Sequence, residues 1–204
     1  MAIIRIIVIG DSFAGKTRLL RRFATGAEAN DDEFETTIGV DYLDAQVMIA
    51  GQEVPVQLWD TAGQEIFRSM TAGWYRRCHA CVLVFSVMDR ASFDHVKSWH
   101  EEVLRNTDTE KGPLPMVLCG NKADFKRREV SQEDALALAV ELNMEYFETS
   151  AKTGSNVDSM FTSLAREAYV RIKENEELMT VTTPGYELRH SRADRRKNSG
   201  GGCC

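Results

Sequence analysis

Short apolar runs separated by polar or amphipathic segments recur along this chain. The first run, residues 3–9, is almost unbroken and rich in β-branched residues, which is typical of a parallel strand buried on both faces. Residues 81–85 and 116–119 have the same character, and residues 146–147 predict a short last strand. The pattern therefore predicts several buried strands that belong to one sheet.

Apolar residues at helical spacing occupy the segments between these strands. Residues 17–23 precede Gly26, which predicts a helix that ends near this glycine. Further helices are expected at about residues 92–106, from Ser131 to about residue 142, and from 156 to about 177.

A hairpin interrupts the alternation of strands and helices. Two strand-like runs meet at residues 50–52, and the second run, 54–58, contains Pro55, which suits a strand near the edge of a sheet. The order of elements predicts an α/β fold with a mostly parallel six-stranded sheet, one antiparallel edge strand and helices on both faces. In such sheets ligands bind at the carboxyl ends of the strands.

The composition is that of a globular protein with one domain. Of 204 residues 43% are hydrophobic and 27% charged, and no apolar stretch reaches the length that spans a bilayer. The net charge of −6 and the dispersed basic residues predict no nucleic-acid partner. The apolar start of the chain lacks the cleavage site of a signal peptide, and five cysteines indicate no disulfide framework, so we expect a cytosolic protein.

Residues 10–17 read GDSFAGKT, which matches the phosphate-loop pattern G-x-x-x-x-G-K-[ST]. In such a loop backbone N–H groups cradle phosphates, Lys16 reaches the outer phosphates, and the Thr17 hydroxyl can bind Mg²⁺. A tight strand-to-helix turn could match the same pattern. The strand before the loop and the helix after it favour a nucleotide site, in which Phe13 is the unusual residue.

Three further motifs each follow a predicted strand. Residues 59–65 read WDTAGQE, in which the aspartate can hold Mg²⁺ through water and the glycine N–H can approach a terminal phosphate. Residues 121–124 read NKAD, and residues 148–152 read ETSAK. The carboxylate of Asp124 can accept two hydrogen bonds from the N1–H and N2–H₂ edge of guanine, which adenine does not offer. These motifs favour a guanine nucleotide.

The four motifs in this order and spacing resemble the Ras-like small GTPases, and WDTAGQE together with the terminal Cys203 and Cys204 resembles the Rab family. The resemblance covers roughly residues 4–175 and the C-terminus. It implies a P-loop NTPase G domain over residues 1–177 and a flexible tail over residues 178–204. The implied function is a GTP/GDP switch that hydrolyses GTP slowly and recruits effectors in vesicle trafficking.

The resemblance also implies a role for individual residues. Lys16 and Gln64 would serve catalysis, Gln64 by orienting the attacking water. Phosphate contacts are expected from Ser12, Phe13, Ala14, Gly15, Lys16, Thr17, Arg18, Thr37 and Gly63. Mg²⁺ is expected on Thr17, Thr37 and, through water, Asp60. The guanine pocket would be formed by Asn121, Lys122, Asp124, Ser150, Ala151 and Lys152.

Two switch segments are implied at about residues 28–39 and 63–75. Tyr42, Trp59 and Trp74 fall where Rab proteins place an aromatic triad that faces effectors, although aromatic residues here could also merely cover the hairpin. The implied partners are an exchange factor, a GTPase-activating protein, effectors, a Rab escort protein and a GDP dissociation inhibitor.

The tail lacks the apolar residues that folding requires, and it ends in Cys203 and Cys204 after a basic stretch at residues 189–197. Rab proteins that resemble this chain carry a geranylgeranyl group on each terminal cysteine. Two lipids and the basic stretch would hold the protein on the cytoplasmic face of an intracellular membrane while it cycles with the cytosol. An unmodified pair of thiols is the alternative.

Three departures from the family pattern stand out. Phe13 replaces a frequent glycine, Ile66 replaces the usual arginine after Q-E, and no aromatic residue occurs between Phe23 and Phe34, where the family covers the guanine ring. Two other functions stay open. A P-loop kinase would need an acceptor site and a lid, and a module that holds GTP without turnover would not need Gln64. The histidines are given no catalytic role.

Overall fold

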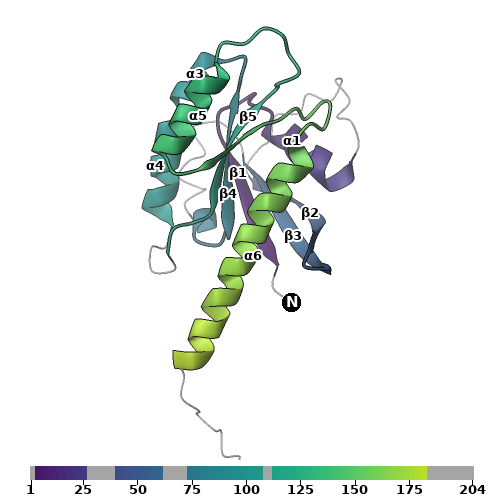
Figure 1. Ribbon diagram of the computed structural model, residues 1–204, viewed down its shortest axis with the longest axis vertical. Coiled ribbons are helices and arrows are strands. Elements are labelled where there is room, and N and C mark those ends of the chain that lie inside the picture. The colour runs from purple at the N-terminus through teal and green to yellow at the C-terminus, as the bar shows by residue number, and fades with distance from the viewer. Residues whose placement is uncertain (1–2, 27–39, 62–72, 108–111, 183–204) are drawn as a thin grey trace, which may run out of the picture.

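A six-stranded sheet forms the centre of the molecule (Figure 1), with the strand order β2-β3-β1-β4-β5-β6. The computed structural model of the chain describes residues 3–26, 40–61, 73–107 and 112–182. The strands are β1 Ile4–Ile9, β2 Val40–Ile49, β3 Gln52–Thr61, β4 Ala80–Ser86, β5 Met116–Asn121 and β6 Glu145–Glu148. The helices are α1 Lys16–Thr25, α3 Arg90–Asp94, α4 Val96–Asn106, α5 Gln132–Glu141 and α6 Val157–Thr182.

The sheet has the predicted mixture of strand directions. The edge strand β2 runs antiparallel to β3, and the other neighbouring strands pair in parallel. Pro55, which cannot donate a backbone hydrogen bond, lies in β3 opposite Gln46 of the edge strand. The predicted α/β class with one antiparallel edge strand is confirmed.

Several predicted boundaries were wrong. The strand expected at residues 54–58 continues to Thr61, so Trp59 and Asp60 lie within β3 rather than after it. The helix expected at 92–106 is divided at His95 into α3 and α4. The last helix, α6, continues to Thr182, beyond the end expected near residue 177.

Helices cover both faces of the sheet (Figure 1). Successive side chains of β1 point to opposite faces, so that this strand contributes to the core on each side. Ile4, Ile6 and Val8 lie in one core cluster with buried residues of α1 and α6. Ile7 and Ile9 lie in the other cluster, which contains buried residues of α4 and α5. Both faces of β1 are thus buried, as its continuous apolar sequence predicts.

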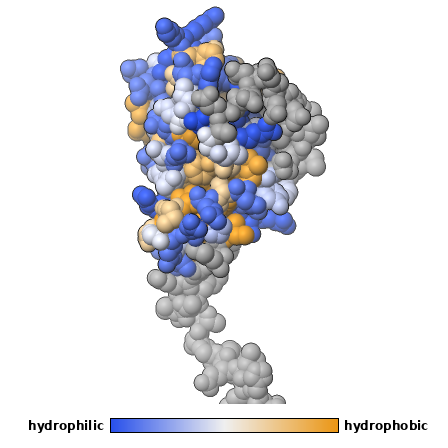
Figure 2. All heavy atoms as spheres, turned by 90° about the vertical axis from the view of Figure 1, so that its right-hand side faces the viewer, coloured by the Kyte–Doolittle hydropathy of each residue, from blue (hydrophilic) through white to orange (hydrophobic). Residues whose placement is uncertain are grey.

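Helices and loops cover the surface beside β2 less completely than they cover the two core clusters. Figure 2 shows apolar residues gathered in the middle of this face and surrounded by hydrophilic ones. Partly buried Leu43 and Ala45 of β2 and Ile172 of α6 pack against the core from outside. Among the described residues no helix is long and apolar enough to cross a membrane.

The parallel strands place their carboxyl ends, and hence the motif loops that follow them, at one edge of the sheet. Gly10 ends β1 at this edge with φ +142°, and a Cβ atom there would lie 2.0 Å from the Val84 carbonyl oxygen. Only glycine lets the chain leave the central strand so close to the backbone of β4.

We predict that Gly10→Ala lowers the free energy of unfolding by roughly 3–5 kcal/mol, because the added methyl group must displace the backbone of β4 and the φ value is strained for alanine. Gly51→Ala is the matched control, since Gly51 also has a positive φ, +79°, but open space around it. The control should cost about 1–2 kcal/mol. Equal losses in urea unfolding of the two variants would contradict the steric argument.

Candidate functional site

The phosphate loop is closed around the side chain of Lys16. The ammonium donates hydrogen bonds to the carbonyl oxygens of Gly10 and Asp11, each at 2.9 Å. Gly15 has φ 95° and is the N-cap of α1, so the loop leads directly into the first turn of this helix. The N–H groups of a first helical turn have no partner within the helix and are suited to bind an anion.

Lys16 is a buried cation, with 6% of its surface exposed. Burial lowers the pKa of Lys16 to about 8, and the nearby carboxylates of Asp60 and Asp11 oppose this shift. The side chain therefore keeps most of its charge at neutral pH because negative groups surround it. A phosphate would find this charge already desolvated and in place.

Phe13 lies in the loop with φ 63°, the left-handed region that favours glycine. Its side chain is 76% exposed, so the ring is not packed into the loop or the core. The backbone N–H of Phe13 is the group that we expect to contact a phosphate.

Thr17 and Asp60 bring two oxygen ligands together beside the loop. The Thr17 hydroxyl donates to Asp60 Oδ2 at 2.6 Å, and Asp60 lies opposite Val8 of β1 and is 5% exposed. A hydroxyl and a carboxylate are the hard ligands that Mg²⁺ accepts, usually with substrate phosphates. Because two protein oxygens leave room for phosphate oxygens, Thr17 and Asp60 suit a magnesium ion shared with phosphate.

Asn121 connects the phosphate loop to the two other motif loops. Its Nδ2 donates to the Ala14 carbonyl at 2.9 Å, while its Oδ1 accepts from the backbone N–H of Ala151 and the hydroxyl of Thr149, each at 3.3 Å. Asn121 is 1% exposed. This amide fixes the NKAD and ETSAK loops relative to GDSFAGKT.

Asp124 is held by a side chain of the ETSAK loop. The Ser150 hydroxyl donates to Asp124 Oδ1 at 2.7 Å, and Asp124 itself is exposed. Lys122 has φ 68°, and its Cε lies 4.0 Å from the point where a Cβ of Gly15 would stand. The lysine stem thus borders the phosphate loop, while Lys152 of the ETSAK loop is exposed.

Comparisons with known proteins agree with this geometry. Residues 5–170 match the model of the Ras family. The chain is 38% identical over 201 residues to the Ras-related protein Rab-26 of Bos taurus, with 98% of this chain and 74% of that protein covered. It is 37% identical to Rab-42 of Mus musculus, covering 98% and 94%, and 42% identical to mouse Rab-39A, covering 84% and 80%.

The chain belongs to the Rab branch of the Ras family. This Rab protein is therefore a small GTPase that binds GTP and GDP and hydrolyses GTP. Membership in a family of GTPases decides against both a kinase and a module without turnover. Rab proteins typically act in vesicle traffic at membranes.

The three aromatic residues that were expected to face effectors, Tyr42, Trp59 and Trp74, lie close together at the hairpin. Trp59 pairs with Tyr42 across β2 and β3, and its ring meets Trp74 edge to face, with the centroids 4.8 Å apart. Tyr42 is 55% exposed, but Trp59 is only 4% exposed. Trp59 thus packs in the core here, Trp74 is half-buried, and Tyr42 is the most exposed of the three.

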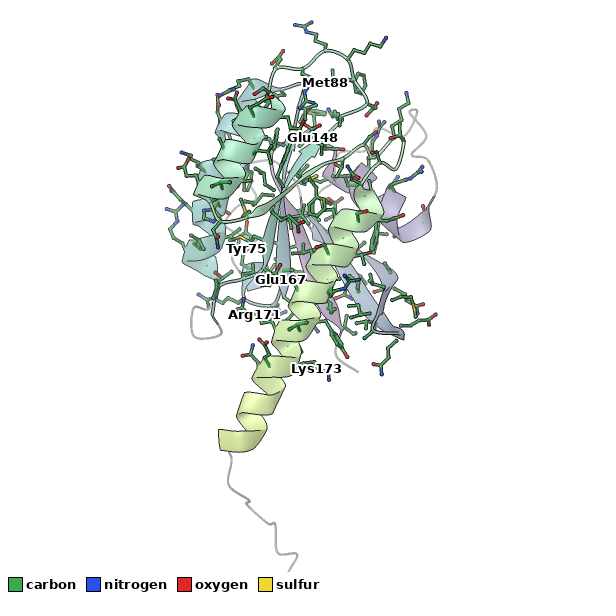
Figure 3. The ribbon with its side chains drawn as sticks, in the orientation of Figure 1. Tyr75, Met88, Glu148, Glu167, Arg171 and Lys173 are labelled. Atoms are coloured by element: carbon green, nitrogen blue, oxygen red, sulfur yellow. The ribbon has the colours of Figure 1, made fainter. Side chains whose placement is uncertain are left out.

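The structure adds residues that the motifs did not single out. Arg128 is paired with Glu148, the first residue of ETSAK, and Tyr146 donates to the same carboxylate at 3.0 Å; Figure 3 shows Glu148 at the motif edge. Burial lowers the pKa of Lys122, and the nearby charge of Arg18 lowers this pKa further. The Arg18 side chain thus acts electrostatically on a residue of the NKAD motif, whereas the expectation for Arg18 was a phosphate contact.

A cavity of about 100 Å³ lies away from these motifs, between residues 75–79, Leu114 and α6. Tyr75 and Arg171 mark it in Figure 3, at the opposite end of the sheet from Glu148. It is not part of the nucleotide edge.

Some expected site residues lie outside the described part of the chain. These are Thr37, Gly63, Gln64, Ile66, Cys203 and Cys204. The first switch and most of the second also lie outside the described residues, so their roles stay predictions.

We predict that GDP binding to this Rab protein weakens as the pH rises above about 8. The phosphates of GDP favour the charged form of Lys16 and raise its pKa, so binding takes up a proton once the free lysine, with a pKa of about 8, has lost it. The association constant at pH 9 should be roughly tenfold lower than at pH 7 by calorimetry. Lys16→Arg keeps its charge, and an equal decline in that variant would contradict the assignment.

We predict that Phe13→Gly slows GDP release. The loop that holds GDP has the left-handed φ, which costs phenylalanine about 1–2 kcal/mol, and this strain would be relieved as the loop opens to release GDP. Stopped-flow release of fluorescent GDP should be up to about tenfold slower for the variant. Faster release would instead show that the ring covers the nucleotide.

Proposed function

We propose that the loops after β1, β3, β5 and β6 form the guanine-nucleotide site of a magnesium-dependent Rab switch. The hydrogen bond from Asn121 to the Ala14 carbonyl is the observation that carries this proposal, because it joins the base-reading motif to the phosphate loop. Ser150 supports it by orienting Asp124 at the same edge. In this assignment Asp124 accepts from guanine, and Asn121, Lys122, Ser150, Ala151 and Lys152 shape the pocket around it.

The phosphates would lie on the N–H groups from Ser12 through Arg18, with the Lys16 ammonium on the β and γ oxygens. Hydrolysis is an in-line attack of water on the γ-phosphorus, which forms a new P–O bond and breaks the bond to the β-phosphate oxygen. Lys16 would stabilise the charge that develops on the phosphate oxygens. Gln64 would orient the water, and the N–H of Gly63 would contact the γ-phosphate.

Thr17 and Thr37 would be the protein ligands of Mg²⁺, with Asp60 holding one of its waters. The 2.6 Å hydrogen bond between Thr17 and Asp60 supports this pairing of ligand and water acceptor. A bound Mg²⁺ neutralises phosphate charge and fixes the phosphate oxygens.

The regulators of this Rab protein would act on the switches at about residues 28–39 and 63–75. An exchange factor would release GDP, and a GTPase-activating protein would supply an arginine to the slow hydrolysis reaction. Effectors would read Tyr42, Trp59 and Trp74, and the exposure of Tyr42 supports that role. Since Trp59 is only 4% exposed, effectors would contact it after the group around it rearranges.

The tail, residues 178–204, would attach the G domain to the cytoplasmic face of an intracellular membrane. Helix α6 carries the chain away from the motif edge, so that its end lies at the opposite end of the molecule (Figure 1). This direction supports a membrane attachment that leaves the nucleotide edge accessible. Geranylgeranyl groups on Cys203 and Cys204 would be added with a Rab escort protein and shielded by a GDP dissociation inhibitor during cycling with the cytosol.

We predict that Asp124→Asn changes the base preference from GTP to xanthosine triphosphate, whose C2 oxygen requires a donor instead of an acceptor. Because a site with an unpaired polar group rejects the wrong base strongly, the ratio of the two affinities should change by at least about 100-fold in competition binding. Asp134→Asn, on the exposed surface of α5, is the matched control and should keep the wild-type ratio. Equal binding of ATP and GTP by the wild type would overturn the assignment of Asp124.

A further inference from the structure

The Asp11 carboxylate connects the phosphate loop to the helical layer. Trp99 Nε1 donates to Asp11 Oδ1 at 2.7 Å, and His95 Nδ1 lies 2.6 Å from Oδ2. The backbone carbonyl of the same aspartate accepts from the Lys16 ammonium at 2.9 Å. One residue thus contacts both the loop cation and two side chains far away in the sequence.

His95 and Trp99 are suited to hold this carboxylate in one place. They are four residues apart and lie on one helical face. The backbone N–H of Trp99 donates to the backbone carbonyl of His95 at 3.1 Å. The Trp99 ring is 4% exposed and belongs to the core cluster between the sheet and helices α4 and α5. The donor is therefore part of a rigid, packed layer, and the carboxylate that it binds is fixed relative to that layer.

The charge of Asp11 explains why such fixing matters for a phosphate loop. An aspartate beside Lys16 is a competitor of phosphate, because either anion can pair with the ammonium. Asp11 is already close enough to Lys16 to oppose the burial-induced fall in its pKa. Both carboxylate oxygens are instead occupied by donors from the helical layer, and only the Asp11 backbone contacts Lys16.

We propose that Trp99 and His95 are positioning residues for nucleotide binding: by holding the Asp11 carboxylate they keep it away from Lys16 and leave the ammonium available to the β-phosphate. The proposal rests on the phosphate loop being the nucleotide site. It places two residues outside all four motifs in control of nucleotide affinity, and it assigns α4 a role in setting the rate of GDP release.

The decisive variant is Trp99→Phe, which keeps an aromatic ring in the core and removes the N–H donor. We expect fluorescent GDP to leave this variant about 10-fold faster than the wild type, which corresponds to the loss of one hydrogen bond to a charged group. GMP has no β-phosphate for Lys16, so its affinity in competition binding should change less than twofold. A variant that merely loosens the fold would lose GDP and GMP equally.

The second measurement removes the competing charge of Asp11 and asks whether slow GDP release is restored. In the Trp99→Phe background, Asp11→Asn should bring GDP release back to within about threefold of the wild-type rate. At the half-exposed His95, His95→Asn retains a donor and should resemble the wild type, whereas His95→Leu should release GDP faster. If a thermal melt shows that Trp99→Phe folds poorly, the two variants His95→Asn and His95→Leu still test the proposal.

Lys97→Gln is the matched control on the same helix, since Lys97 pairs with Glu141 on the surface, and it should leave GDP release unchanged. Unchanged release by both Trp99→Phe and His95→Leu, or an equal loss of GDP and GMP, would overturn the positioning role. Lys16→Ala tests the nucleotide site separately: wild-type GDP affinity in that variant would overturn the site itself, and the positioning role with it.

Discussion

The buried ammonium of Lys16 is the charge on which the whole motif edge depends. A cation without solvent needs negative partners, and this one takes them from the backbone of its own loop and from the carboxylates of Asp60 and Asp11. These partners lie on different segments, so β1, β3 and the phosphate loop must come together for the charge to be stable. Nucleotide binding then adds phosphate to an environment that is already arranged for it.

Two residues of the same edge have unfavourable backbone conformations. Phe13 and Lys122 both have φ in the left-handed region, at 63° and 68°. Such residues persist only where the surrounding structure determines their position, and here the two cores on either face of β1 supply that support. Asn121 contributes by bonding to Ala14 and Ala151 at once. Two of the loops proposed to hold the nucleotide thus contain a strained residue, although Ala50 in the β2–β3 hairpin and Asn143 before β6 have positive φ as well.

In the proposed function, both sides of that edge would take part in regulation of this Rab protein. The aromatic group around Trp59 and Trp74 is packed inward, with only Tyr42 widely exposed, so recognition by effectors would depend on how the neighbouring switches arrange it. On the other side, the contact of α4 with Asp11 connects the helical layer to the loop. We propose that side chains packed against the sheet couple the nucleotide state to the outer surface.

The sequence by itself determined the sheet, the motif loops and their chemistry. Apolar periodicity and the spacing of GDSFAGKT, WDTAGQE, NKAD and ETSAK are local properties, and parallel strands bring their following loops to one edge whatever the details. Only the tertiary structure decided which distant side chains support those loops. His95 and Trp99 follow Asp11 by more than 80 residues, and Arg128 pairs with Glu148 of another loop. Nothing in local propensity encodes such pairs, because they depend on where packing places each helix against the sheet.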